Sequence, residues 1–118
     1  MNQTTKVYDL EERTSKFSEL IIDIAKKTPK SLITAPIIDQ LIRSGTSIGA
    51  NYFEANGASS KKDFRNKIYI CKKEARETLY WLRLLAHSSE LVKDDCRVLR
   101  KEVGELIMIF GKILSNTK

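Results

Sequence analysis

Hydrophobic residues recur along the chain at alternating steps of three and four, which is the spacing of one face of an α-helix. The pattern predicts four helices, at residues 9–27, 35–56, 60–87 and 94–115. The third helix carries the most regular apolar stripe, which runs through Phe64, Ile68, Cys71, Ala75, Thr78, Leu82 and Leu85. No segment alternates between apolar and polar positions as a half-buried strand would. We therefore expect an all-α protein.

Candidate capping residues mark the ends of these helices. Asp9 can cap the first helix, and Ser60 with Asp63 resembles a capping box for the third. Asn56-Gly57 follows the second helix with residues that tolerate the left-handed conformation of a helix end. The connectors are short and polar, so we predict an antiparallel up-and-down four-helix bundle that forms a single domain, residues 1–118.

The second predicted helix contains two interior glycines, Gly45 and Gly49. A glycine inside a helix costs roughly 1 kcal/mol relative to Ala, so their four-residue spacing predicts that another helix packs closely there. Ile42 and Phe53 extend the apolar arc of this helix beyond one core face. This width predicts contact with another subunit, and hence a homo-oligomer.

Another side of the second helix carries polar residues that, with two acids of the third helix, we call the polar network: Arg43, Ser47, Asn51, Glu54, Glu74 and Glu77. Such a ladder is compatible with a solvated face, a ligand site or a network between helices or subunits. We favour a structural network. In it, Arg43 pairs with Glu74 or Glu77, or with an acid of a neighbouring subunit.

Charge adds a second candidate site. The net charge is +6, and between Lys61 and Arg83 eight Lys and Arg face three Asp and Glu, a surplus of five. At about 100° per residue, most of these cations gather beside two tyrosines on one strip of the third helix. We call this set the basic strip: Lys61, Lys62, Arg65, Tyr69, Lys72, Lys73, Arg76, Tyr80 and Arg83.

The basic strip has the chemistry of a nucleic-acid interface. Cations displace the counterions of a phosphate backbone, and aromatic ring faces stack on accessible bases. The alternative is a solvated helix face on which the tyrosines cover a subunit contact.

Catalytic and metal-binding patterns are missing from the sequence. His87 is the single histidine, and Cys71 and Cys96 are the two cysteines, so there is no zinc pattern and no phosphate-cradling glycine loop. We predict no enzymatic activity, no metal and no cofactor, and we expect both thiols to be buried and reduced. Apolar runs fall short of the roughly 20 residues of a membrane span, and the polar start lacks a signal peptide. A cytoplasmic protein without a membrane partner is expected.

A family resemblance rests on the second and third predicted helices. The residues that carry it are Arg43-Ser44, Ser47-Ile48, Asn51, Glu54, Asp63-Phe64, Glu74-Ala75 and Glu77-Thr78-Leu79-Tyr80-Trp81-Leu82. They resemble the signature of small bacterial four-helix bundle proteins, some of which are encoded in intervening sequences of large-subunit ribosomal RNA genes. The first and fourth helices match only in pattern. Tyr52 and Phe53 depart from the small or aliphatic residues that many members have there.

The resemblance implies an up-and-down bundle assembled as a homopentamer. It also implies kinship with the accessory variability determinant of diversity-generating retroelements, a basic pentamer that associates with a reverse transcriptase and nucleic acid. It brings no enzymatic activity, and the molecular function of most members is undefined. Two main hypotheses follow, and a small-molecule enzyme whose catalytic residues converge from distant positions is a third. The first is a non-enzymatic oligomer that binds structured RNA or a nucleoprotein, such as a reverse transcriptase complex, through the basic strip. The alternative is a scaffolding oligomer that binds an acidic protein and no nucleic acid.

Overall fold

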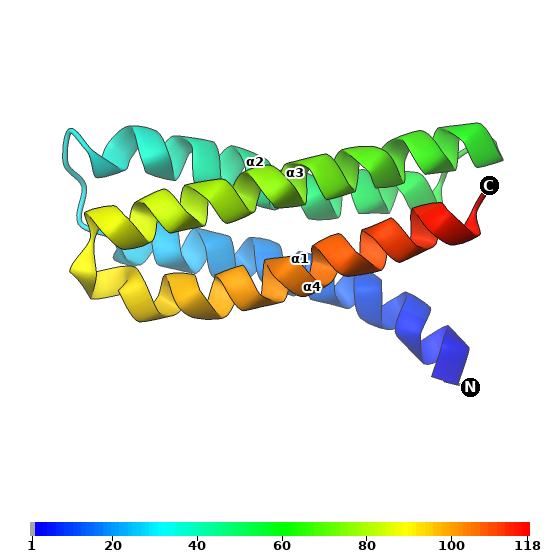
Figure 1. Ribbon diagram of the computed structural model, residues 1–118, viewed down its shortest axis with the longest axis horizontal. Coiled ribbons are helices and arrows are strands. Elements are labelled where there is room, and N and C mark those ends of the chain that lie inside the picture. Colours follow the sequence, from blue (N-terminus) through cyan, green and yellow to red (C-terminus); the bar gives the residue numbers. More distant parts are fainter. Residues whose placement is uncertain (1) are drawn as a thin grey trace.

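The computed structural model describes the backbone of residues 2–118 and the side chains of residues 10–118. Its α-helices are α1 (Asn2–Lys27), α2 (Thr34–Asn56), α3 (Lys61–Ser88) and α4 (Lys93–Asn116), and a short 3₁₀ helix, η1 (Glu90–Val92), precedes α4. The chain runs up and down through the helices in sequence order (Figure 1). In this described part the protein is helical without strands, which confirms the predicted all-α class.

Two predicted helix ends are wrong. α1 begins at Asn2 rather than at Asp9, because residues 2–8 contain neither Gly nor Pro to break the helix. The predicted cap by Asp9 lies outside the described side chains. At the end of α2, Gly57 has a φ of −104° and is not left-handed. Its N–H donates to the carbonyl of Glu54, three residues back, so the last turn tightens into 3₁₀ geometry instead.

The start of α3 has the predicted serine cap but not the full capping box, because the carboxylate of Asp63 accepts from the N–H of Ser59 rather than from that of Ser60. Ser60 has extended backbone geometry, and its Oγ accepts a hydrogen bond of 3.0 Å from the N–H of Asp63. This bond satisfies one of the donors that every helix leaves unpaired in its first turn.

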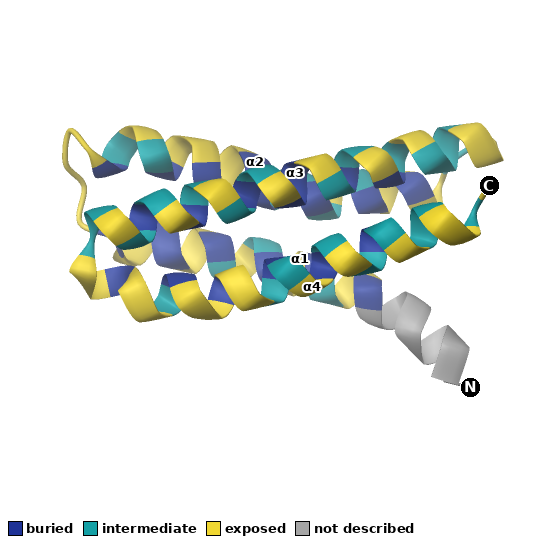
Figure 2. Cartoon of the chain, in the orientation of Figure 1, coloured by how far each residue is buried: buried dark blue, intermediate teal, exposed yellow. Residues whose placement is uncertain are grey.

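The core lies along the inner sides of all four helices, where the buried residues face one another (Figure 2). Its fully buried large side chains include Phe17 and Ile21 of α1, Leu41 and Ile48 of α2, Ile68 and Leu82 of α3, and Val103, Leu106 and Phe110 of α4. α2 packs extensively against both α1 and α3, and α3 against α4, whereas α1 and α4 share a less extensive contact. Among the described residues, no helix combines the length and apolarity that a membrane span requires.

Both cysteines belong to this core. Cys71 and Cys96 are buried and unbridged, and the Sγ of Cys71 donates to the carbonyl of Ile48. Burial raises the pKa of Cys71 to about 12 and that of Cys96 to about 11. Both thiols therefore stay protonated near neutral pH, and the prediction that both cysteines are buried is confirmed.

The glycines of α2 allow α1 to approach closely. A Cβ atom added at Gly45 would lie 2.8 Å from Ile21 Cγ1, and one added at Gly49 would lie 3.3 Å from both the carbonyl oxygen of Thr14 and Ser18 Oγ. Neither position has room for a side chain without movement of α1. Gly45 and Gly49 are therefore packing residues, as their spacing predicts.

Replacing Gly45 by Ala is expected to lower the free energy of unfolding by up to about 2 kcal/mol, because overpacking against the buried, β-branched Ile21 costs about 1–3 kcal/mol while helix propensity returns only about 1 kcal/mol. Gly104→Ala is the matched control, since a Cβ there meets no atom within 4 Å. It should stabilise α4 by up to about 1 kcal/mol through helix propensity alone. Urea denaturation measures both changes, and a Gly45→Ala variant as stable as Gly104→Ala would contradict the close approach.

Candidate nucleic-acid interface

The basic strip lies mainly on the side of α3 that faces away from the core. Its exposed members are Lys61, Lys62, Tyr69, Lys73, Arg76, Tyr80 and Arg83, whereas Lys72 and Arg65 are partly buried. Tyr69 and Tyr80 are 63% and 55% exposed as residues. α2 and α4 pack against other sides of α3, so the strip is the part of this helix that remains available to a partner.

Arg65 differs from the rest of the strip. Its Nη1 donates to the carbonyl oxygens of Leu114 and Thr117, both at 2.6 Å. These carbonyls lie at the C-terminal end of α4, where unpaired acceptors and the negative end of the helix dipole favour a cation. Arg65 is therefore engaged within the fold, and we assign it to structure rather than to the interface.

The other cations of the strip have no carboxylate partner among the described side chains. The ion pairs of residues 10–118 use Arg13, Lys27, Arg43, Lys67, Lys93 and Arg97. Lys67 belongs to α3 but faces α2, where its Nζ lies 2.8 Å from Glu54 Oε1. The positive charge of these side chains on the outer side of α3 is thus available to an external anion.

Part of the basic strip surrounds a shallow hollow of about 260 Å³, lined by Tyr69, Lys72, Lys73 and Arg76. Lys72 extends toward α4, because a Cβ atom added at Gly111 would lie 3.7 Å from its Nζ. The second tyrosine of the strip does not line this hollow.

Tyr80 has a different environment. Its ring packs edge-on against Trp81, with ring centroids 5.2 Å apart and an interplanar angle of 71°. The two tyrosines of the strip are therefore not equivalent.

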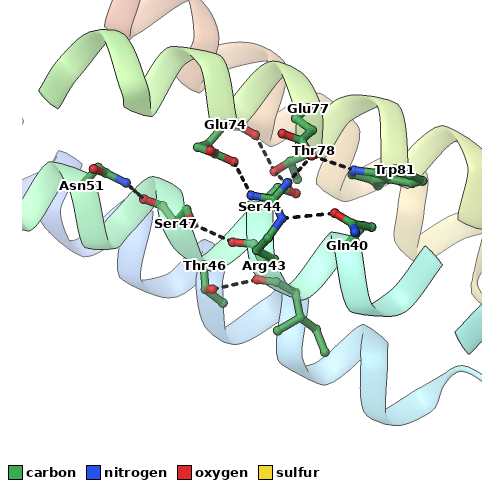
Figure 3. A network of polar contacts seen from close by, with 11 residues as sticks. Gln40, Arg43, Ser44, Thr46, Ser47, Asn51, Glu74, Glu77, Thr78 and Trp81 are labelled. Atoms are coloured by element: carbon green, nitrogen blue, oxygen red, sulfur yellow. Dashed lines mark hydrogen bonds and ion pairs between the residues drawn. The ribbon is translucent and has the colours of Figure 1, made fainter. Parts of the chain in front are cut away.

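The polar network centres on Arg43, which lies between two acids of α3 (Figure 3). Its Nη1 is 3.2 Å from Glu74 Oε1, its Nη2 donates to Glu77 Oε2, and its Nε donates to Gln40 at 3.1 Å. The indole N–H of Trp81 donates to the same oxygen of Glu77. The hydrogen bonds from Trp81 and Arg43 lower the pKa of Glu77, so this carboxylate stays ionised at neutral pH.

Three members of the predicted network do not join this cluster. Ser47 Oγ donates to the carbonyl of Arg43 at 2.7 Å, and Asn51 Nδ2 donates to the carbonyl of Ser47 at 2.9 Å. These are local bonds to the backbone four residues earlier. Glu54 pairs with Lys67 instead. The ladder thus divides into a cluster around Arg43 that joins α2 to α3 and a set of bonds local to α2, with a separate ion pair near its end.

A buried hydroxyl pair lies beside this cluster. Thr78 Oγ1 is 2.9 Å from Ser44 Oγ and 2.7 Å from the carbonyl oxygen of Glu74. Both side chains are fully buried, and hydrogen bonding satisfies them there. The predicted apolar stripe of the third helix includes Thr78 without revealing this bond. The sequence carries no direct signal for this bond, because it depends on the register between α2 and α3.

Arg43→Ala should lower the free energy of unfolding by about 1–2 kcal/mol, because Glu74, largely buried, would lose its cation. This is less than the roughly 3–5 kcal/mol of a fully buried pair, since the Arg43 side chain is 47% exposed. Arg97→Ala breaks a fully exposed pair with Asp94 and should change stability by less than about 0.5 kcal/mol. Thermal denaturation compares the variants, and equal losses would show that Arg43 contributes no more than a surface ion pair.

Other candidate sites offer less chemistry. A hollow of about 240 Å³ between α1 and α4 is lined by Leu20, Asp23, Ile24, Lys27, Asp95, Val98 and Leu99, and Lys27 pairs with Asp95 there. Within the described part of the chain, no three His, Cys, Asp or Glu residues form a group that could hold a metal ion. His87 is exposed in the last turn of α3.

Comparison with known proteins identifies relatives. A family model described as 23S rRNA-intervening sequence protein matches residues 6–112. The crystal structure of a protein with unknown function from the S23 ribosomal protein family of Bacteroides thetaiotaomicron VPI-5482 is similar, with 32% sequence identity and a TM-score of 0.76. The similarity covers 88% of this chain and 96% of that one. A search of curated proteins gave no match.

Proposed function

The chain belongs to the 23S rRNA-intervening sequence protein family, and from this premise we propose that it is a non-enzymatic, homo-oligomeric bundle that binds structured RNA or a nucleoprotein through the basic strip. A reverse transcriptase complex is one such nucleoprotein. The observation that carries the proposal is the row of exposed cations, Lys61, Lys62, Lys73, Arg76 and Arg83, which have no described carboxylate partner and flank two exposed tyrosines.

The physical basis is counterion release. A cation that neutralises a phosphate frees a condensed counterion, so affinity falls as salt rises, with a slope of roughly 0.7 per contact for single strands. The rings add sequence-tolerant stacking on unpaired bases. The family description names an intervening sequence of 23S rRNA, and the similar solved protein is assigned to a ribosomal protein family, so RNA is the polyanion to test first.

Neutralising Lys73, Arg76 and Arg83 together by Gln is expected to abolish most RNA affinity and to reduce the salt slope by about 2, because three phosphate contacts are lost. The matched control replaces three exposed lysines of α1 and the following connector by Gln: Lys16, Lys26 and Lys30. It removes the same charge from other surfaces. Fluorescence anisotropy with labelled RNA over a salt series gives both quantities. Equal losses in the two triple variants would mean that only net charge matters.

The alternative function is a scaffold whose basic strip binds an acidic protein. It predicts that the wild-type protein has no affinity for RNA even at low salt. If a protein partner is recovered, competition by RNA for that partner separates the two functions, since only the nucleic-acid proposal expects displacement.

We also propose that the chain assembles with copies of itself as a pentamer. Ile22 of α1 is exposed, as are Ile42 and Phe53 of α2, and the ring of Phe53 is 70% exposed. At about 100° per residue, Ile42 and Phe53 lie together on one side of α2, next to the side that Gly45 and Gly49 turn toward α1. This apolar side supports self-association. The number five comes from the family resemblance alone.

Light scattering on the purified protein tests the assembly. The wild type should have the mass of a pentamer, and Phe53→Ser should dissociate it by removing the largest exposed apolar side chain of this face. Leu32→Ser is the control, because Leu32 is 95% exposed in the connector between α1 and α2, away from that face. A monomeric wild type at micromolar concentration would refute self-association, whereas a dimer or tetramer would refute only the stoichiometry.

A further inference from the structure

We propose that the hollow on α3 is a subsite for one unpaired nucleotide of an RNA strand, whose phosphate contacts Lys72, Lys73 and Arg76 and whose base stacks on Tyr69. This inference rests on the proposed function and narrows it from the whole basic strip to a single place with a stated ligand. The proposed subsite includes only these four residues of the basic strip. Arg65, Tyr80 and the cations at the two ends of the strip are not part of it.

The four lining residues come together because of their spacing. Tyr69, Lys72, Lys73 and Arg76 stand at positions i, i+3, i+4 and i+7, so Tyr69 and Arg76 each lie three or four residues from both lysines and are their neighbours on the helix surface. The ring is at one end of the group and Arg76 at the other, about 10 Å apart along the axis. A phosphate and the base attached to the same sugar can therefore be contacted together.

The lining selects for an anion. It consists of three cations and one ring, with no Asp or Glu. Like charges three or four residues apart repel one another and weaken a helix by a small amount. Two other cations of α3 are used internally, since Arg65 binds the carbonyls of α4 and Lys67 pairs with Glu54. In the hollow no described group balances the charge, and a phosphate would.

The size of the hollow favours a nucleotide within a strand over a free metabolite. Its volume of about 260 Å³ is below the roughly 300–1,000 Å³ of pockets that enclose small molecules, and Tyr69 is 63% exposed. A free nucleotide would remain largely in solvent there. A nucleotide in a strand is also held through its neighbours by the other cations of the strip. Duplex RNA keeps its bases paired and stacked, so Tyr69 should act only on unpaired segments.

The first test replaces Tyr69. Tyr69→Ala should weaken binding of a labelled oligouridylate about tenfold, the effect expected for one lost stacking contact, while a duplex RNA of the same length binds as before. Tyr69→Phe keeps the ring and should bind both RNAs like the wild type. Anisotropy titrations measure the affinity of each variant for both RNAs, and the ratio of the two affinities is compared with that of the wild type. Circular dichroism checks that the variants remain helical.

The second test leaves every lining residue unchanged. Gly111 of α4 faces Lys72, with 3.7 Å between an added Cβ and Nζ, so Gly111→Glu places a carboxylate beside the proposed phosphate position. Gly104→Glu is the matched control: it makes the same change on the same helix, about 10 Å along the axis, where an added Cβ meets no atom within 4 Å. Oligouridylate affinity should fall several-fold more for Gly111→Glu than for Gly104→Glu.

The outcomes separate this subsite from the broader function. If the wild type binds oligouridylate but Tyr69→Ala binds it equally well, or if the two Glu variants lose equal affinity, the subsite is refuted while RNA binding by the strip stands. If the wild type binds neither RNA at low salt, RNA binding and the subsite are both refuted. Selective loss in Tyr69→Ala and in Gly111→Glu together supports the subsite.

Discussion

At Gly45 the backbone of α2 comes so close to α1 that one added methyl group would lie 2.8 Å from Ile21 Cγ1. The rest of the bundle depends on this close packing of α2. On its other side α2 is joined to α3 by the buried pair of Ser44 and Thr78 and by Arg43. A helix held at both sides leaves its neighbours little freedom to rotate. The orientation of α3, and with it the outward position of its cations, follows from these contacts.

The charges of α3 have three separate roles because of this orientation. Toward α2, Glu74 and Glu77 hold Arg43, and Lys67 holds Glu54. Toward α4, Arg65 satisfies the last carbonyls of that helix. Only the cations between these two contacts face solvent without a described partner. A count of charges along α3 therefore overstates the interface, and the pattern of ion pairs identifies which charges remain available.

Periodicity was enough to predict the helical class, the four helices and the packing role of Gly45 and Gly49. It also put Arg43 on a polar strip of the second helix and named Glu74 and Glu77 among its candidate partners, although spacing within one helix does not decide between them and an acid of a neighbouring subunit. It could not predict that Arg65 reaches Leu114, since that contact depends on the register between α3 and α4.

Side-chain bonds to the local backbone explain why Ser47 and Asn51 do not join the predicted polar network. Ser47 and Asn51 bind the backbone of their own helix, which a helical wheel does not reveal. The bond between Thr78 and Ser44 escapes the pattern for the opposite reason, because a hydroxyl residue fits an apolar stripe when a neighbouring helix supplies its partner.

The repulsion among the unpaired cations of the hollow on α3 is an energetic reason to expect an anionic ligand there. Lys72, Lys73 and Arg76 repel one another on one helix face, and no described carboxylate offsets that repulsion. The same helix shows that its cations can be used for stability, because Arg65 and Lys67 have internal partners. Repulsion of this kind is small in water and salt, so the fold tolerates it. A bound phosphate would convert it into attraction, and by linkage any anion that prefers the folded state must also stabilise it. An anion bound at these three cations would therefore relieve their repulsion and stabilise the fold at the same time.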